Sequence, residues 1–533
     1  MVSNQSTLID PVFDFANFVQ NEVIKNETEN LPTRAKAVEH KEVLHTLLKE
    51  IQLVDFVSLI RPEAKELITE FQAIVDAYES GNKELHKKLN VPKNNEETSR
   101  VLEIEVHLNN CKKSIKQKHY VVCIIIEILK LAKSSNWNLC KCYDYVYVYN
   151  GAYWKQLSKE DLKYFLGQAA IKMGYPPIEA MYHLFKDELL KQFIADAHLS
   201  VPAVNPDKIL INLQNGTFEF TGSTWNLRPF DPADFITYQL PFGYDKLARC
   251  PKYVTYLNAV LPDADCRAIL QEYSGFIFTK LNLEKCLVLT GSGSNGKSVF
   301  FNILTALLGK ENTLTYSMGL FNHEYNRARL TNVLLNYSSE KGTDLNVETF
   351  KALISGEPLQ AREPYGKPFE INNKVKFIMN CNELPKETES TDAYFRRYII
   401  IPFDVKISEK DRDINLANDI IKSELPGVFN WLLNGLERLI HQKDFTIASK
   451  ASTALANFKK QSDSIALFIE EFNYIPSTSI KISLADLYTL YKTFCLDDGY
   501  KPFGKNRFSS ILESKGFEAT RSNDGSKSFF ISK

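Results

Sequence analysis

The stretch Leu287-Val-Leu-Thr-Gly-Ser-Gly-Ser-Asn-Gly-Lys-Ser298 decides how the chain is organised. Residues 287–290 are largely apolar and predict a short buried strand, whereas residues 299–308 have the apolar spacing of a helix. Between them, residues 291–298 match in full the G-x-x-x-x-G-K-[ST] pattern of a phosphate-binding loop. Because this loop lies between a strand and a helix, we interpret it as a nucleotide-binding site and not as an ordinary turn.

A triphosphate needs several backbone N–H groups that converge on it, and side chains would obstruct that approach. Glycines in the loop leave the backbone accessible, and the N-terminus of the following helix adds a partial positive charge. Lys297 can reach the β- and γ-phosphates, and the Ser298 hydroxyl can be a ligand of Mg²⁺. The residues predicted to bind the nucleotide are Gly291, Ser292, Gly293, Ser294, Asn295, Gly296, Lys297, Ser298 and Val299.

Length and composition bound the class of protein. A chain of 533 residues is expected to hold three or four domains of about 150 residues each. Its 64 basic and 65 acidic residues balance, so any nucleic-acid surface must be local. The nine cysteines show no regular spacing, which indicates a reducing compartment. Without a signal sequence or an apolar run long enough to span a membrane, we expect a soluble, intracellular protein with no membrane partner.

The chain before the phosphate loop predicts three regions. Residues 1–115 form a helical region of unknown role, without the Asp-x-Asp pair that a two-metal polymerase or primase site would need. Residues 116–250 predict a small α/β domain, because two Asn-Gly pairs, at 150–151 and 215–216, lie between aromatic and β-branched residues as in β-hairpins. Residues 251–280 predict a helical connection.

The nucleotide-binding domain is expected at residues 281–405. Further strand candidates lie at residues 333–337, 375–379 and 398–401, with helical segments between some of them. This alternation favours a mostly parallel sheet with helices on its faces. Residues 406–463 again predict helices.

Two groups of residues allow more than one interpretation. Aromatic side chains of the first hairpin could stack on nucleic-acid bases, although cross-strand packing is the commoner role; these are Tyr145, Tyr147, Tyr153 and Trp154. Cysteine and histidine side chains could bind zinc, although their spacing matches no common zinc pattern and buried thiols are the simpler interpretation; these are Cys111, His119, Cys123, Cys140 and Cys142.

Residues 464–533 have a pattern of their own, with two predicted helices followed by two strands around residues 523–525. This is the order of a winged helix. Seven basic and three acidic residues give residues 501–533 a net charge of +4, which suits a phosphate backbone. We predict DNA contacts by Lys505 and Arg507, with protein interaction as the alternative.

A nucleotide-hydrolysing site also needs a carboxylate that orients water, a polar sensor near the γ-phosphate and a cation for the developing charge. Glu340 and Asn382 each follow a strand candidate, and the pair Arg396-Arg397 precedes another. In this order, the motifs resemble the superfamily III helicases, a branch of the AAA+ ATPases. The greatest similarity is to the helicase part of phage and plasmid primase-helicases, which the poxvirus primase-helicase also resembles.

The resemblance covers residues 120–533, and it implies roles for individual residues. Glu340 would polarise the attacking water and help to hold Mg²⁺, and Asn382 would be the sensor. Arg397, with Arg396 as the second choice, would reach the ATP of a neighbouring subunit. Ser339 departs from the family, since many AAA+ proteins have an aspartate there, so Mg²⁺ would depend on Ser298 and water.

Residues 362–369 are expected to form a hairpin with Tyr365-Gly366-Lys367 at its tip. In the helicases that the chain resembles, such hairpins point into a central channel and bind the DNA backbone. We therefore predict DNA contacts by Lys367, Tyr365 and Arg362, with a solvated turn as the alternative.

The resemblance implies an α/β fold: an AAA+ phosphate-loop ATPase core with an N-terminal helical region, a small α/β domain and a C-terminal winged helix. The expected function is an ATP- and Mg²⁺-dependent DNA helicase, working as a hexameric ring in the replication of a phage, plasmid or other mobile element. Expected partners are single-stranded or forked DNA, further copies of the chain and a separate primase or polymerase, in a bacterial or infected-cell cytoplasm. The alternative is an AAA+ ATPase switch that binds DNA or protein without unwinding.

Overall fold

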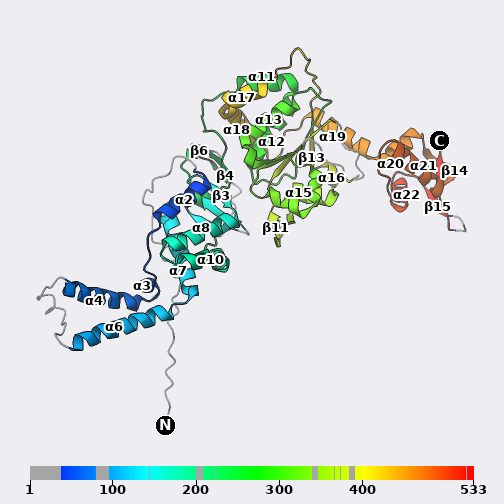
Figure 1. The fold of residues 1–533 in the computed structure, drawn as a ribbon. Coiled ribbons are helices and arrows are strands. Elements are labelled where there is room, and N and C mark those ends of the chain that lie inside the picture. Colours follow the sequence, from blue (N-terminus) through cyan, green and yellow to red (C-terminus); the bar gives the residue numbers. More distant parts are fainter. Residues whose placement is uncertain are drawn as a thin grey trace, which may run out of the picture.

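The computed structural model describes most of the chain (Figure 1). The described residues are 38–79, 95–142, 145–199, 208–221, 224–338, 346–364, 366–372, 374–382, 391–521, 523 and 525–533. Two residues predicted to act at the site, Glu340 and Tyr365, lie outside these ranges. None of the described helices is both long enough and apolar enough to cross a membrane.

The first part of the described chain combines helices with an antiparallel sheet. The sheet contains β1 (Leu139–Cys142), β2 (Tyr145–Tyr149) and β3 (Trp154–Leu157), and it confirms the first predicted hairpin. The helices are α2 (His40–Glu50), α3 (Phe56–Ile60), α4 (Pro62–Glu79), α6 (Asn95–Ser114), α7 (Gln117–Ser134), α8 (Lys159–Lys172), α9 (Pro177–Met181) and α10 (His183–Asp196). Figure 1 shows that α4 and α6 form a pair that projects from the other elements.

One hydrophobic core joins α2 and α3 to the sheet β1–β3 and the helices α7–α10. Leu47 of α2 and Phe56 of α3 belong to the same buried cluster as Ile124, Val148 and Phe165. The cluster therefore crosses the domain boundary expected near residue 115. Since α2 and α3 have short apolar faces, they need the helices after residue 116 to cover them.

The aromatic side chains of the first hairpin are packed and not displayed to solvent. Tyr145, Tyr147 and Trp154 are buried, and the indole Nε1 of Trp154 donates to the carbonyl O of Pro232 at 2.8 Å. Tyr153 is half-buried. The packing interpretation is thus confirmed for the three buried rings, which leave no open face for a base.

The buried-thiol interpretation is confirmed for Cys140 and Cys142, whereas Cys111 and Cys123 are half-buried. Desolvation raises the pKa of Cys123 to about 11. In the part of the chain that the structure describes, no three His, Cys, Asp or Glu side chains gather as a metal site would require.

The second antiparallel sheet consists of β4 (Lys208–Leu213), β5 (Gly216–Thr221) and β6 (Thr224–Arg228), and it confirms the second predicted hairpin. It does not share the first sheet's core. Its residues Leu213 and Phe218 lie in the cluster that contains Leu287 and Leu289, and the Phe218 and Phe429 rings are 5.8 Å apart. The region expected at 116–250 is therefore divided between two cores.

A parallel five-stranded sheet forms the centre of the region expected at residues 281–405, as predicted. The strand order is β13 (Tyr398–Pro402), β7 (Cys286–Thr290), β12 (Lys376–Cys381), β9 (Leu335–Ser338) and β8 (Thr313–Leu314). The surrounding helices include α11 (Pro251–Val260), α12 (Ala264–Phe276), α13 (Lys297–Leu308), α15 (Val347–Ser355), α17 (Leu416–Ser423), α18 (Leu425–Gln442) and α19 (Ser449–Ser462). Shorter elements are α14 (Glu324–Arg327), α16 (Asp392–Phe395) and the hairpin of β10 (Pro358–Arg362) with β11 (Pro368–Asn372).

Helices α12 and α18 are joined by a buried carboxylate. Glu272 of α12 is fully buried, and it accepts hydrogen bonds from Arg438, Gln442 and both the N–H and the hydroxyl of Thr446. The helices also approach closely, since a Cβ on Gly435 would lie 2.5 Å from backbone atoms of Gln271. Because both carboxylate oxygens of Glu272 accept hydrogen bonds, its burial leaves no unpaired oxygen. All these donors come from residues 438–446.

The C-terminal unit follows α19. It consists of α20 (Ser464–Glu471), β14 (Ile475–Ser483), α21 (Leu484–Asp497), α22 (Lys505–Ser514), β15 (Ala519–Arg521) and β16 (Lys527–Ser532). Phe468, Tyr491 and Phe508 lie at the centre of its own core. The two helices and the final hairpin predicted here are present, whereas β14, which pairs with β16, was not predicted.

Lys376 is a buried cation at the start of β12. Its Nζ donates to the carbonyl O of Leu281 at 3.0 Å and lies 3.8 Å from the centroid of the Phe276 ring. Desolvation, with a smaller contribution from Lys374, lowers the pKa of Lys376 to about 7.

We expect this lysine to make stability depend on pH. Because the pKa of Lys376 is lower in the folded chain than the ordinary value near 10.4, the unfolded chain binds more protons between these values, and the free energy of unfolding should rise from pH 7 to pH 10. Lys376→Met should flatten that rise, measured by denaturant unfolding at pH 7, 8 and 9. The control is Lys422→Met, at an exposed side chain that does not contribute to the pKa of Lys376. Equal slopes in wild type and Lys376→Met would contradict the assignment.

Candidate nucleotide-binding site

The phosphate loop lies between β7 and α13, as predicted, and its backbone requires glycine. Gly291, Gly293 and Gly296 have φ values of 154°, 97° and 85°. Around Gly291 there is also no space, since a Cβ there would lie 2.0 Å from Asn295 Nδ2 and 2.5 Å from the carbonyl O of Phe403. A side chain at this position would therefore disrupt the loop for both conformational and steric reasons.

Neighbouring segments hold the loop from outside. The Nδ2 of Asn295 donates to the carbonyl O of Phe403 at 3.1 Å, and the N–H of Ile407 donates to the carbonyl O of Ser294 at 2.7 Å. On the other side, the Tyr256 hydroxyl of α11 donates to the carbonyl O of Gly296 at 2.8 Å. The loop is thus fixed by the segment after β13 and by α11.

Lys297 lies inside the loop. Its Nζ donates to the carbonyl O of Gly291 at 2.6 Å and to Oδ1 of Asn295 at 3.1 Å, and burial lowers its pKa. A phosphate would compensate this desolvated cation better than two neutral oxygens do. Ser298 is exposed in the first turn of α13, where its hydroxyl is accessible to a metal bound by phosphates.

Two other predicted site residues, Asn382 and Glu340, follow parallel strands whose carboxyl ends lie on the same side of the sheet as the loop. In the parallel register, Cys381 of β12 lies beside Thr290 of β7, so Asn382 emerges next to the phosphate loop and is exposed. Strand β9 ends at Ser338, two positions before Glu340, which lies outside the described residues. Ligands of open α/β sheets bind at this carboxyl edge.

Asn380 is a candidate that the sequence analysis missed. It lies on the same face of β12 as Ile378, which packs in the core with α13. Its Oδ1 is buried and has no hydrogen-bond partner among the described residues. The available signal was a polar side chain within the apolar stretch 377–381. Because an amide oxygen accepts and only Nδ2 donates, a contact with a phosphate would have to come from Nδ2. Asn380 is therefore an alternative sensor candidate to Asn382 by its position on the face toward α13, and not by this oxygen.

The two arginines, Arg396 and Arg397, lie at the amino ends of the parallel strands, whereas the phosphate loop lies at their carboxyl ends. They precede β13, whose first residue pairs with Cys286 while its last pairs with Thr290. This strand separates them from their own loop by about 13 Å, at roughly 3.3 Å per residue. The arginines therefore cannot serve the phosphate site of their own subunit in this arrangement.

Their environments differ. Arg397 is buried, donates to the Ser355 hydroxyl at 2.8 Å and lies 3.1 Å from the Glu284 carboxylate. Arg396 also pairs with Glu284, at 3.0 Å, but 62% of its side chain is exposed. Of the pair, Arg396 is the side chain that a neighbouring subunit could contact, whereas Arg397 is held within the fold.

The hairpin of β10 and β11 confirms the expected hairpin. Lys367 is exposed in its loop, whereas Nε of Arg362 donates to the carbonyl O of Gly366 at 2.9 Å and so closes the turn. Next to this loop, the Phe369 ring meets the ring of Tyr145 at 5.8 Å, which connects the hairpin to the first sheet. Strand β11 leads almost directly into β12 and the sensor candidates.

In the C-terminal unit, Lys505 and Arg507 are both exposed at the start of α22. The Arg507 guanidinium lies 4.6 Å from the centroid of the Phe503 ring. Both cations lie in the first turn of α22, at the positive end of the helix, an arrangement that an anion would stabilise.

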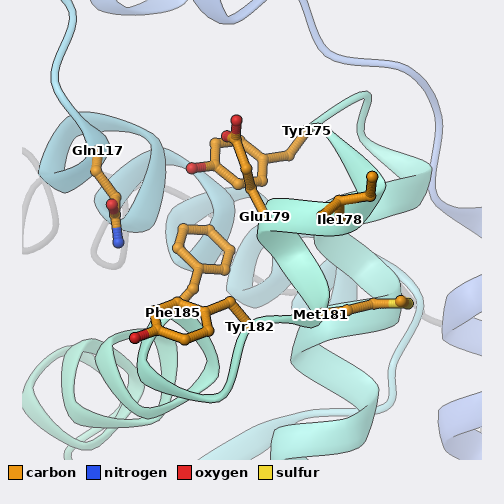
Figure 2. A pocket seen from close by; sticks show the side chains of 7 residues that line it. All are labelled: Gln117, Tyr175, Ile178, Glu179, Met181, Tyr182 and Phe185. Atoms are coloured by element: carbon orange, nitrogen blue, oxygen red, sulfur yellow. The ribbon is translucent and has the colours of Figure 1, made fainter.

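A hollow of about 490 Å³ lies elsewhere, beside α9 in the N-terminal part (Figure 2). It is lined by Gln117, Tyr175, Ile178, Glu179, Met181, Tyr182 and Phe185. None of these seven is basic or was predicted as a site residue. The rings of Tyr175 and Phe185 stack on each other at 4.4 Å, so they form its wall.

Three family models match separate parts of the chain. Residues 126–262 match the D5 N terminal like family, residues 289–397 match a family of unknown function (DUF5906), and residues 460–529 match the Poxvirus D5 protein-like family. Two of the three family names thus share the designation D5, and the third family covers the predicted phosphate loop.

Viral proteins named as helicases are similar over part of their length. The protein 121R of Invertebrate iridescent virus 3 is 22% identical over 338 residues, which cover 55% of this chain and 36% of that protein. The protein L207/L206 of Acanthamoeba polyphaga mimivirus is 25% identical over 217 residues, which cover 38% of this chain and 22% of that protein. The protein 184R of Invertebrate iridescent virus 6 is 27% identical over 234 residues, which cover 40% of this chain and 24% of that protein. The chain spans about a quarter to a third of these relatives. A solved structure, the apo C-terminal region of NrS-1, is 14% identical with a TM-score of 0.45, covering 76% of this chain and 98% of that one.

These matches confirm the predicted resemblance to superfamily III helicases. Within that class, the chain is similar to the primase-helicase type, and in particular to the poxvirus D5-like proteins.

Proposed function

We propose that this protein is an ATP-dependent DNA helicase that works as a ring, with six subunits, in the replication of a viral or other mobile element. The observation that carries the proposal is the placement of Arg396 at one edge of the central sheet and the phosphate loop at the other. A cation that cannot reach its own loop is suited to complete the site of the next subunit, and a ring supplies such a neighbour at every position.

Within this proposal, each residue has a defined task. Lys297 and the loop N–H groups bind the phosphates of ATP, and Ser298 with Glu340 would hold Mg²⁺, which neutralises phosphate charge when bound. Glu340 orients the attacking water, and Asn380 or Asn382 contacts the γ-phosphate. Arg396 approaches from the neighbour, while Arg397 holds Glu284 and the start of β13.

DNA contacts are assigned to two places. The hairpin offers Lys367 as a sequence-independent contact to the backbone, with Arg362 shaping the turn and Tyr365 beside it. The C-terminal unit has a helix–strand–helix–helix–strand–strand order that supports the winged-helix interpretation, with Lys505 and Arg507 on α22 as its contacts. A separate primase or polymerase would supply priming.

The proposal is tested by strand displacement. The wild-type protein should unwind a forked DNA in the presence of ATP and Mg²⁺, and it should not do so with a non-hydrolysable ATP analogue. ATP hydrolysis without displacement would favour the alternative, an AAA+ switch that binds DNA or protein. Absence of both ATP binding and hydrolysis would contradict the proposal entirely.

The hairpin carries a further expected result. Lys367→Ala should reduce both the DNA stimulation of ATP hydrolysis and the unwinding rate, because the exposed ammonium would lose its contact with the DNA backbone. The measurement compares ATP turnover with and without forked DNA. Lys422→Ala, at an exposed lysine of α17, is the matched control. Wild-type unwinding by Lys367→Ala would move the DNA contact to other residues.

A further inference from the structure

Helix α11 lies directly against the junction of the phosphate loop and α13. The hydroxyl of Tyr256 donates to the carbonyl O of Gly296 at 2.8 Å. There is no space for a side chain between them, since a Cβ on Gly296 would lie 2.8 Å from Cγ1 of Val260 and 3.1 Å from the Tyr256 ring. The junction of the loop and α13 thus packs against the buried face of α11.

The bonded carbonyl belongs to the peptide that begins α13. Its oxygen also accepts from the N–H groups of Val299 at 2.9 Å and Phe300 at 3.2 Å. In a trans peptide the C=O and the following N–H point in opposite directions. Holding the Gly296 oxygen toward α11 and α13 therefore directs the N–H of Lys297 outward from the helix N-terminus, where a phosphate would bind.

The helix that carries Tyr256 is itself fixed. The buried carboxylate of Glu424, the residue before α18, accepts hydrogen bonds from the N–H groups of Lys252 and Tyr253, each at 3.1 Å. These are two of the first N–H groups of α11, which have no partner within the helix. Since α11 is anchored at its start and packed against the loop further on, the Tyr256 hydroxyl is held in a defined place.

We propose that Tyr256 is a positioning residue for the phosphate site: it orients the Gly296–Lys297 peptide so that the Lys297 N–H faces a bound polyphosphate. The inference rests on the proposed ATP binding. It also assigns to α11, which precedes the central sheet in the chain, a direct part in nucleotide affinity.

The test is Tyr256→Phe, which removes the hydroxyl and keeps the ring. The loss of one hydrogen bond should raise the KM for ATP by roughly three- to tenfold with little change in kcat, since the N–H binds ground state and transition state alike. Affinity for inorganic tripolyphosphate should fall by the same factor, because the effect concerns phosphate and not the base. Tyr253→Phe, on the same helix with its ring packed against Trp431, is the control.

Three outcomes separate the possibilities. Weakened binding of both ATP and tripolyphosphate by Tyr256→Phe, with wild-type values for Tyr253→Phe, supports the inference. A Tyr256→Phe protein with wild-type affinities overturns it, as does weakened ATP binding with unchanged tripolyphosphate binding. If the wild-type protein binds neither ligand, the proposed function itself fails, which is a distinguishable result.

Discussion

Replacing Lys297 by alanine is expected to reduce ATP turnover by a factor of about 100 to 1,000, the loss that follows removal of one donor directed at developing charge. The ammonium group is buried in the loop with two neutral oxygens as partners, and desolvation lowers its pKa. Phosphate binding would give it a full counter-charge, so the site gains most from this one side chain. Phosphate release under saturating ATP and Mg²⁺ is the measurement.

Two comparisons make this result interpretable. Lys310→Ala removes an exposed lysine just beyond the C-terminal end of α13 and should leave turnover unchanged. ATP should raise the melting temperature of the wild-type protein more than that of Lys297→Ala, because the stabilisation by a ligand grows with its affinity for the folded chain. Normal turnover in Lys297→Ala would remove the phosphate loop from the mechanism.

Arg396→Ala is expected to cost about a thousandfold or more in ATP hydrolysis, the range measured for arginines supplied to a phosphoryl-transfer site by a partner. Its side chain is 62% exposed, so its removal should not unfold the chain. If it acts on a neighbour, mixing Arg396→Ala with Lys297→Ala subunits should restore part of the activity. Each variant damages a different half of a shared site, and some mixed interfaces contain two intact halves.

The control for mixing is Arg412→Ala, at another exposed arginine, which should be fully active alone. A mixture that is shown to co-assemble and yet remains inactive would contradict action between subunits. Arg397→Ala asks a different question, because it removes a buried cation from Ser355 and Glu284 and should lower stability. Comparing melting temperatures of the two variants separates a catalytic loss from a structural one.

The sequence allowed the central sheet and its loop to be predicted because local signals coincide there. Residues 287–290 are apolar, the glycines suit positive φ values, and the following helix has regular spacing. The same agreement holds for the two Asn-Gly hairpins. Where a short segment contains both the apolar spacing of a helix or strand and the turn residues that end it, local chemistry suffices to identify the element.

Tertiary packing could not be predicted in the same way. Nothing in residues 208–228 indicates that this sheet packs on Phe429 and not on its neighbours in sequence. The arginine pair is similar, since adjacent positions gave no reason why one side chain is buried on Ser355 and the other exposed. Asn380 was missed because its buried oxygen becomes apparent only once the strand faces α13.

The buried carboxylate of Glu272 also has a consequence for synthesis on the ribosome. Its ion-pair partner Arg438 lies 166 residues further along the chain. At about 5 to 20 residues per second, translation would take roughly 8 to 33 s to produce that partner. The phosphate loop is synthesised well before then, so the nascent chain would contain the complete loop before α18, which packs against α12, has been made. Nucleotide binding should therefore begin only after the chain has emerged past α18.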